Sequence, residues 1–99
     1  MTVAMKVAVL MPAYNAAAFI GAALASLLQQ RDAADLDIIV VNDGSTDGTG
    51  EIVRGICAGA PEVRLIEQDR GGIARARNVG IGAIAAGTDL VSFLDADDL

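Results

Sequence analysis

Apolar runs of strand length alternate with segments of helical periodicity along this chain of 99 residues. The runs rich in Val, Ile and Leu are "KVAVLM" (6–11), "DIIVVN" (37–42), "EVRLIE" (62–67) and "TDLVSFL" (88–94), and each is expected to form a strand. Strands joined by helices run parallel through right-handed crossovers. The sequence therefore predicts the α/β class, with a doubly wound, mostly parallel sheet of order βαβαβαβ.

The segments between these runs predict three helices. Residues 16–30 are expected to form the first, with Asn15 placed to cap it, and Gly59 and Pro61 are expected to stop the second. The third is expected over residues 73–86. The side chains expected to face the sheet are Ile20, Leu24, Leu27 and Leu28 in the first helix, Ile52, Val53, Ile56 and Cys57 in the second, and Ile73, Ala76, Gly80, Ala83 and Ile84 in the third.

Composition agrees with a buried sheet and narrows the function. Hydrophobic residues make up 54% of the chain and aromatic residues only 3%, which is typical of a parallel sheet under helices and excludes disordered and fibrous classes. A net charge of −6 argues against a non-specific nucleic-acid binder. With one Cys and no His, any metal must be held by oxygen. No apolar stretch is long enough to span a bilayer, so we expect a cytoplasmic protein, with membrane association of a longer protein as an open alternative.

Polar residues gather where the predicted strands end, and ligands of doubly wound sheets bind at that edge. The four exits are residues 12–15, 43–46, 68–72 and 95–98. At the last exit Asp95 and Asp97 share one side of an extended chain, so they can hold one divalent cation, and carboxylates suit Mg²⁺ or Mn²⁺. A solvated acidic turn is the alternative.

The third exit carries an arginine cluster. Arg75 and Arg77 fall in the first turns of the third helix, near Arg70, although a helix N-terminus disfavours cations. Together with free backbone N–H groups behind "GG", they predict a site for phosphate or pyrophosphate. The alternative is that these arginines pair with Glu67, Asp69 or the aspartates near the end of the chain.

Four sequence pieces, in order at the four exits, resemble one known family. They are "VLMPAYN", "IIVVNDGSTDGT", "GGIARARNVGI" and "FLDADD". The chain from Lys6 onward resembles the N-terminal, nucleotide-binding half of the family 2 glycosyltransferases, whose fold is the Rossmann-like GT-A fold. The resemblance implies sugar transfer, with inversion, from a nucleotide diphosphate donor, commonly UDP-linked, with Mn²⁺ or Mg²⁺ at a D-x-D motif. It divides the chain into a tail of residues 1–5 and a nucleotide-sugar-binding half over residues 6–99.

The resemblance also assigns site residues. Tyr14 would lie near the base, Asp43 would accept a hydrogen bond from it, and Arg77 would be the basic residue of the donor site. On the residues alone, Tyr14 reads as a half-buried turn aromatic and Asp43 as a turn-capping carboxylate. The implied metal ligands are Asp95 and Asp97, with Asp97 making most of the contact, and the implied nucleotide-sugar residues are Pro12, Ala13, Tyr14, Asn15, Asp43, Gly71, Arg77, Asp95 and Ala96.

The resemblance places the catalytic base past the D-x-D motif, in a segment expected beyond Leu99, so none is expected among these residues. The chain is expected to be truncated after that motif and to be inactive alone. Expected partners are a nucleotide-sugar donor and a carbohydrate or lipid-linked acceptor. The strand order expected for this fold class is 3-2-1-4, which leaves the strand ending at Leu94 on an open edge and predicts self-association.

Two other functions stay open at this point. A nucleotidyltransferase-like enzyme would share the metal and nucleotide chemistry, but it would usually show a Gly-rich, basic loop where this chain has "PAYN". A non-catalytic nucleotide-binding module, such as a receiver-like domain, would want a lysine late in the sheet, whereas Lys6 is the only lysine.

Overall fold

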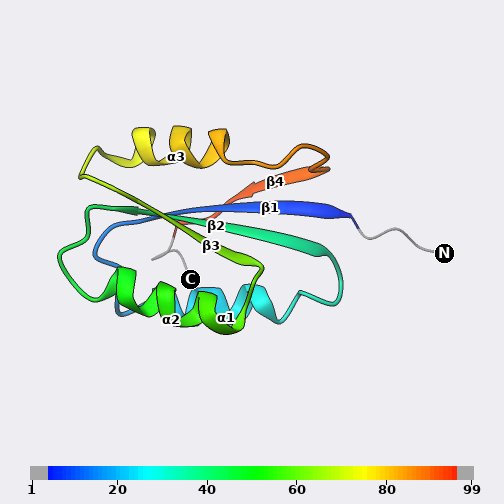
Figure 1. The fold of residues 1–99 in the computed structure, drawn as a ribbon, viewed down its shortest axis with the longest axis horizontal. Coiled ribbons are helices and arrows are strands. Elements are labelled where there is room, and N and C mark those ends of the chain that lie inside the picture. Colours follow the sequence, from blue (N-terminus) through cyan, green and yellow to red (C-terminus); the bar gives the residue numbers. More distant parts are fainter. Residues whose placement is uncertain (1–4, 96–99) are drawn as a thin grey trace.

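The computed structural model describes residues 5–95 and confirms the predicted alternation of strands and helices. In chain order the elements are β1 (Lys6–Ala13), α1 (Ile20–Leu28), β2 (Asp35–Asp43), α2 (Thr49–Gly59), β3 (Val63–Gln68), α3 (Ile73–Gly82) and β4 (Leu90–Phe93). All pairings are parallel and the strand order is β3-β2-β1-β4, as expected. Figure 1 shows α1 and α2 on one face of the sheet and α3 on the other, which is the doubly wound arrangement.

The core lies on both faces of the two central strands, β1 and β2. Val9, Met11, Ile38 and Val40 pack toward α1 and α2, while Leu10, Ile39 and Val41 pack toward α3 around Ala76. Successive strand residues point to opposite faces, so a continuous aliphatic run fills both layers at once. This packing fixes the carboxyl edge of the sheet, where the predicted site residues gather.

The start of α1 differs from the sequence prediction. The helix begins at Ile20, its N-cap position is Phe19, and no side chain caps it, so the prediction that Asn15 caps this helix is wrong. Asn15 instead has a positive φ of 48°. Its N–H donates to Ser45 Oγ at 2.9 Å and its Oδ1 accepts from the Thr46 N–H at 2.8 Å. The side chain is therefore used to join the exits of β1 and β2.

The third helix is shorter than predicted. It ends at Gly82, and Ala83 and Ile84 pack against the core from just beyond it. Ala76 and Gly80 are buried as expected, but Ile73 is 50% exposed, so its predicted inward position is wrong. The reason is its place in the fold: Ile73 is the first residue of α3, at the edge of the sheet, where it lines a cleft and does not cover a strand.

Strand β4 is also more exposed than its apolar sequence suggests. All four of its residues are exposed, including Leu90 and Phe93 at 52% and 51%. Within residues 5–95, β4 pairs with β1 alone, so it forms an edge of the sheet. The described helices are too short to cross a membrane, the longest being α2 with 11 residues.

We expect the 99-residue chain to self-associate through β4, because an apolar edge strand offers unpaired backbone groups to a second strand. Size-exclusion chromatography should show an apparent mass above the 10.1 kDa of the monomer, rising with concentration. Val91→Lys places a charge on this edge and should shift the equilibrium toward monomer. Ala58→Lys, on the exposed face of α2, is the charge-matched control. A concentration-independent monomer would contradict the expectation.

Candidate functional site

The four strand exits meet at a cleft of about 350 Å³, which we call the edge cleft. Parallel strands end at the same edge of a sheet, so residues distant in sequence come together there. The first exit contributes Pro12, Ala13 and Tyr14, the second Asp43, the third Arg70 and the fourth Asp95. The rest of the lining consists of Ala16, Ile73 and Ala76.

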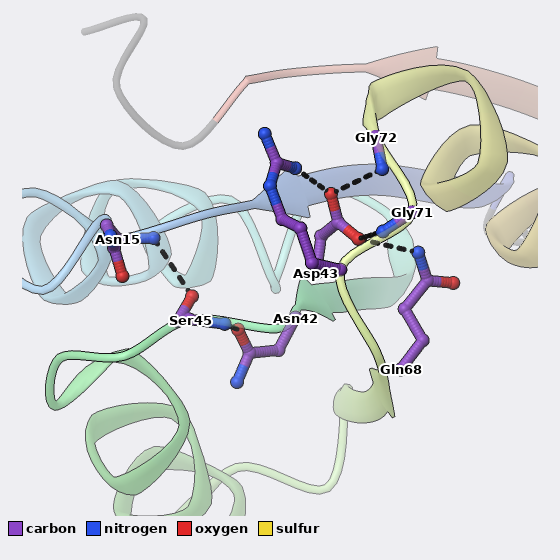
Figure 2. A network of polar contacts seen from close by, with 8 residues as sticks. Asn15, Asn42, Asp43, Ser45, Gln68, Gly71 and Gly72 are labelled. Carbon is purple, nitrogen blue, oxygen red and sulfur yellow. Dashed lines mark hydrogen bonds and ion pairs between the residues drawn. The ribbon is translucent and has the colours of Figure 1, made fainter.

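Asp43 is the most buried polar residue of the edge cleft, with 2% of its surface exposed. Its Oδ1 accepts hydrogen bonds from Gln68 Nε2 at 2.9 Å and from the Gly71 N–H at 2.7 Å. Its Oδ2 accepts from the Gly72 N–H at 3.0 Å and from the Arg70 guanidinium. Figure 2 shows Gln68, Gly71 and Gly72 arranged around this carboxylate. A carboxylate offers about four acceptor positions, so the protein itself fills all of them.

These contacts keep Asp43 ionised. Burial alone raises the pKa of a carboxyl group, but hydrogen bonds from Gln68, the Gly71 and Gly72 N–H groups and Arg70 outweigh it and lower the pKa of Asp43 below its ordinary value. The ionised carboxylate ties β2 to the loop that leads into α3. The N–H groups of Gly71 and Gly72 are thus already engaged and are not free for a phosphate.

Arg70 bridges Asp43 and Tyr14 across the edge cleft. Its guanidinium carbon lies 3.8 Å from the centroid of the Tyr14 ring while the same group pairs with Asp43. Tyr14 is 45% exposed, and the Arg70 side chain is 52% exposed. A stacked guanidinium on an aromatic face is a cation–π contact. One side of the cleft is therefore closed by a half-exposed cation.

Of the other two arginines in the predicted cluster, Arg77 Nη2 lies 3.9 Å from Asp95 Oδ1, with both side chains more than a third exposed. Arg75 lies against Gly71. Ion pairing, the alternative stated for this cluster, therefore occurs for Arg70 and Arg77. The acid that pairs with Arg70 is Asp43, which was not among the partners expected for these arginines.

The predicted metal ligands are only partly visible. Asp95 lines the edge cleft with a side chain that is 36% exposed, while Ala96 and Asp97 lie outside the described residues. Within residues 5–95 no three acidic or cysteine side chains gather into a metal-binding group. An accessible carboxylate on the cleft wall is a hard oxygen donor, which fits Mg²⁺ or Mn²⁺.

The expected position of the catalytic base is not tested by this structure. Leu99, beyond which the resemblance places that base, lies outside the described residues, as do the three residues before it. The expectation that the chain is truncated after the D-x-D motif falls on the same segment. Both expectations therefore stay predictions.

A second network, which we call the loop clasp, comprises Asn15, Ser45, Thr46, Asp47 and Thr49. The Ala16 N–H donates to Thr49 Oγ1 at 2.9 Å, and the Ala17 N–H donates to Asp47 Oδ2 at 3.1 Å. A hydrogen bond from the Thr49 hydroxyl, with others from backbone N–H groups, lowers the pKa of Asp47. The contact from Asn15 to Ser45 is visible in Figure 2. The loop clasp holds the Tyr14 turn against the exit of β2.

Sequence reasoning missed several of these roles. Gln68 and Gly72 were not singled out as partners of Asp43, and no local pattern identifies them because the contacts cross from β2 to the loop after β3. The loop clasp did leave a signal in "DGSTDG", whose Ser, Thr and Asp side chains often bind nearby backbone N–H groups.

Known proteins resemble this chain in sequence and in fold. A glycosyltransferase of Bacillus subtilis called EpsJ, itself uncharacterised, is 42% identical over 92 residues, which are 93% of this chain and 26% of that protein. The mannosyltransferase PcManGT from Pyrobaculum calidifontis, solved with GDP-Man and Mn²⁺, superposes with a TM-score of 0.82 at 32% identity over 97% of this chain and 28% of that one.

A third match is glucosyl-3-phosphoglycerate synthase from Mycobacterium tuberculosis, solved with Mn²⁺, UDP and glucosyl-3-phosphoglycerate. Its TM-score is 0.73 at 28% identity, over 94% of this chain and 34% of that one. The chain thus spans about a quarter to a third of the length of these proteins. Their shared parallel sheet and helices identify the fold as GT-A.

The family model for glycosyl transferase family 2 matches residues 8–99, nearly the whole chain. That match sets aside the receiver-like and nucleotidyltransferase-like alternatives. The chain belongs to glycosyl transferase family 2.

Proposed function

We propose that this chain binds the donor of an inverting glycosyltransferase, which transfers a sugar from a UDP-linked donor to the hydroxyl of a carbohydrate or lipid-linked acceptor. The observation that carries the proposal is the edge cleft, which has an aromatic ring and a buried carboxylate at one place and Asp95 at another. Arg77, which pairs with Asp95, is not one of the residues that line the cleft. Together these are the groups that a nucleoside diphosphate needs: a flat surface and an acceptor for its base, and charges for its phosphates.

The base would lie near Tyr14 and Asp43. The half-exposed ring of Tyr14 offers a stacking surface, and Asp43 is an ionised acceptor that could take a ring N–H of uracil in place of one of its four present donors. Pro12 and Ala13 are buried at the end of β1 and shape the wall behind them. The loop clasp, through Asn15, fixes the angle at which Tyr14 leaves this strand.

The diphosphate would lie near Arg77 and Asp95. Arg77 is half exposed and its contact with Asp95 is long, so its guanidinium can turn to phosphate oxygens. Asp95 and Asp97 would hold a Mn²⁺ or Mg²⁺ ion, with Ala96 between them. When bound, such an ion stabilises the negative charge of the departing nucleotide. The catalytic residue that would deprotonate the acceptor hydroxyl is expected outside this chain. We therefore propose that the 99 residues bind the donor without transferring its sugar.

The two solved proteins described above support the choice of ligand class. One is complexed with GDP-Man and the other with UDP, and both hold Mn²⁺. A cytoplasmic location is part of the same proposal.

Calorimetry with UDP should detect binding in the presence of Mn²⁺ and roughly a tenfold or greater loss of affinity in a chelator, because Asp95 otherwise repels the phosphates. Asp95→Ala should reduce the effect of Mn²⁺, and Arg77→Ala should weaken UDP by roughly ten- to a hundredfold through a lost charge-assisted contact. Asp32→Ala, in an exposed turn, is the control.

Equal affinity for UDP with and without chelator would remove the metal from the proposal. Tighter binding of GDP than of UDP would reassign the base. If Arg77→Ala lowered the thermal midpoint while UDP affinity stayed unchanged, Arg77 would be a structural ion-pair partner.

A further inference from the structure

Arg70 occupies the two surfaces that the proposed function gives to the base. Its guanidinium lies over the Tyr14 ring, 3.8 Å from the centroid, and pairs with Oδ2 of Asp43. A guanidinium is flat and carries N–H donors on its edge, so it can stack on a ring and donate to a carboxylate at the same time. A uracil ring would make the same pair of contacts.

We propose that Arg70 stands in for the nucleobase in the ligand-free protein and must leave the edge cleft when a nucleotide binds. The inference rests on the proposed function. Arg70 is then an internal competitor that sets the affinity and the entry rate of the base. The loop clasp and the other partners of Asp43 stay in place during this exchange.

Arg70 is the partner of Asp43 that can leave most easily. Two of the other donors are backbone N–H groups, of Gly71 and Gly72, and the third is the amide of Gln68 on β3. The Arg70 side chain is 52% exposed, so solvent can take up its charge when it turns away. Asp43 would keep three hydrogen bonds and regain one acceptor position on Oδ2, where a base N–H can bind.

Displacing Arg70 from Tyr14 and Asp43 should weaken the binding of a nucleobase by a measurable factor. A cation–π contact with a half-exposed ring and an ion pair whose arginine is half exposed each contribute modestly, and their combined loss corresponds to roughly a tenfold change in affinity. The ligand must be neutral to isolate this factor, because removing a cation also weakens the attraction of any phosphate. Uridine meets that requirement, since it carries the base and no phosphate.

The experiment measures uridine binding to the wild-type chain and to Arg70→Ala by tyrosine fluorescence. Tyr14 is the only tyrosine and the chain has no tryptophan, so the emission reports on this ring alone. We expect Arg70→Ala to bind uridine about tenfold more tightly than wild type. Its ligand-free emission should also differ, because the stacked cation is gone. Arg31→Ala, which removes an exposed arginine paired with Glu62, should match wild type.

Arg70→Gln carries the test if Arg70→Ala proves unfolded, since glutamine keeps a flat polar head without the charge. Unchanged uridine affinity in the folded variant would overturn the inference, and weaker affinity would make Arg70 a ligand contact. If UDP with Mn²⁺ still bound in either case, the proposed function would stand without the exchange. If neither the wild-type chain nor any variant bound uridine or UDP, both the proposed function and the inference about Arg70 would be wrong.

Discussion

Asp43→Ala should lower the free energy of unfolding by about 3–5 kcal/mol, because three hydrogen bonds to a buried, charged carboxylate are lost and each contributes about 1–2 kcal/mol. The variant leaves the Gly71 and Gly72 N–H groups and the Gln68 amide without their acceptor, and it releases the Arg70 side chain. Urea denaturation of the variant and the wild-type chain measures the loss. A loss below about 1 kcal/mol would contradict it, since that is the value of an ordinary surface pair.

Asp43→Asn tests whether the charge carries this effect. Because its pKa is lowered in the folded chain, ionised Asp43 contributes stability above its ordinary pKa of 3.8, and that contribution is lost as pH falls through the lower folded value. The stability difference between wild type and Asp43→Asn should therefore be constant at neutral pH and shrink on acidification. A difference that stays constant through the acid limb would assign the effect to shape alone.

Gly44→Ala should be the second most damaging substitution, with a loss of about 2–5 kcal/mol from a strained backbone and a steric overlap together. Gly44 has a φ of 69°, which disfavours any side chain. A Cβ there would lie 2.6 Å from the backbone nitrogen of Arg70 and 2.9 Å from its Cα. Backbone atoms cannot rotate away, so the loop before α3 must shift, and uridine affinity should change as well.

Gly87→Ala is the matched control for this prediction. Gly87 has a similar φ of 86°, but nothing lies within 4 Å of a Cβ built there. Its loss should therefore reflect backbone strain alone, about 1–2 kcal/mol. If urea denaturation gave equal losses of unfolding free energy for Gly44→Ala and Gly87→Ala, the close approach of the Arg70 backbone to Gly44 would contribute nothing to the loss.

The order of elements and of strands was predictable because it depends on features that repeat along the sequence. Four aliphatic runs separated by helical segments allow few topologies once crossovers are right-handed. The edge position of β4 followed from the expected order 3-2-1-4, and the structure has that order. The exposure of all four of its residues did not follow, since "LVSF" is the same sequence whether or not other elements cover it.

Part of the candidate site could likewise be predicted from the sequence, and part of it could not. That Asp43 and Tyr14 would approach one another follows from strand exits sharing one edge. The donors around Asp43 do not follow, because they depend on how far the loop after β3 reaches back over β2. Asn15 is a further example. Ala13 of β1 lies beside Asn42 of β2, and this register brings Asn15 next to Ser45. Asn15 therefore bonds to the loop after β2 and does not cap the helix that follows it in the sequence.

The pairing of β4 with β1 has a consequence for how the chain folds. The Lys6 N–H donates to Asp89 Oδ2 at 2.8 Å across a separation of 83 residues, whereas on its other side β1 pairs with β2, where Lys6 lies opposite Asp35. The longer loop adds only about 1 kcal/mol of closure entropy, so chain entropy hardly separates the two events. During synthesis β2 is made before β4, so β1 can pair with β2 first. Its second partner, β4, is the last strand to be made. Until β4 arrives, β1 presents a bare aliphatic edge, and this interval is the one in which a folding chain is most open to aggregation.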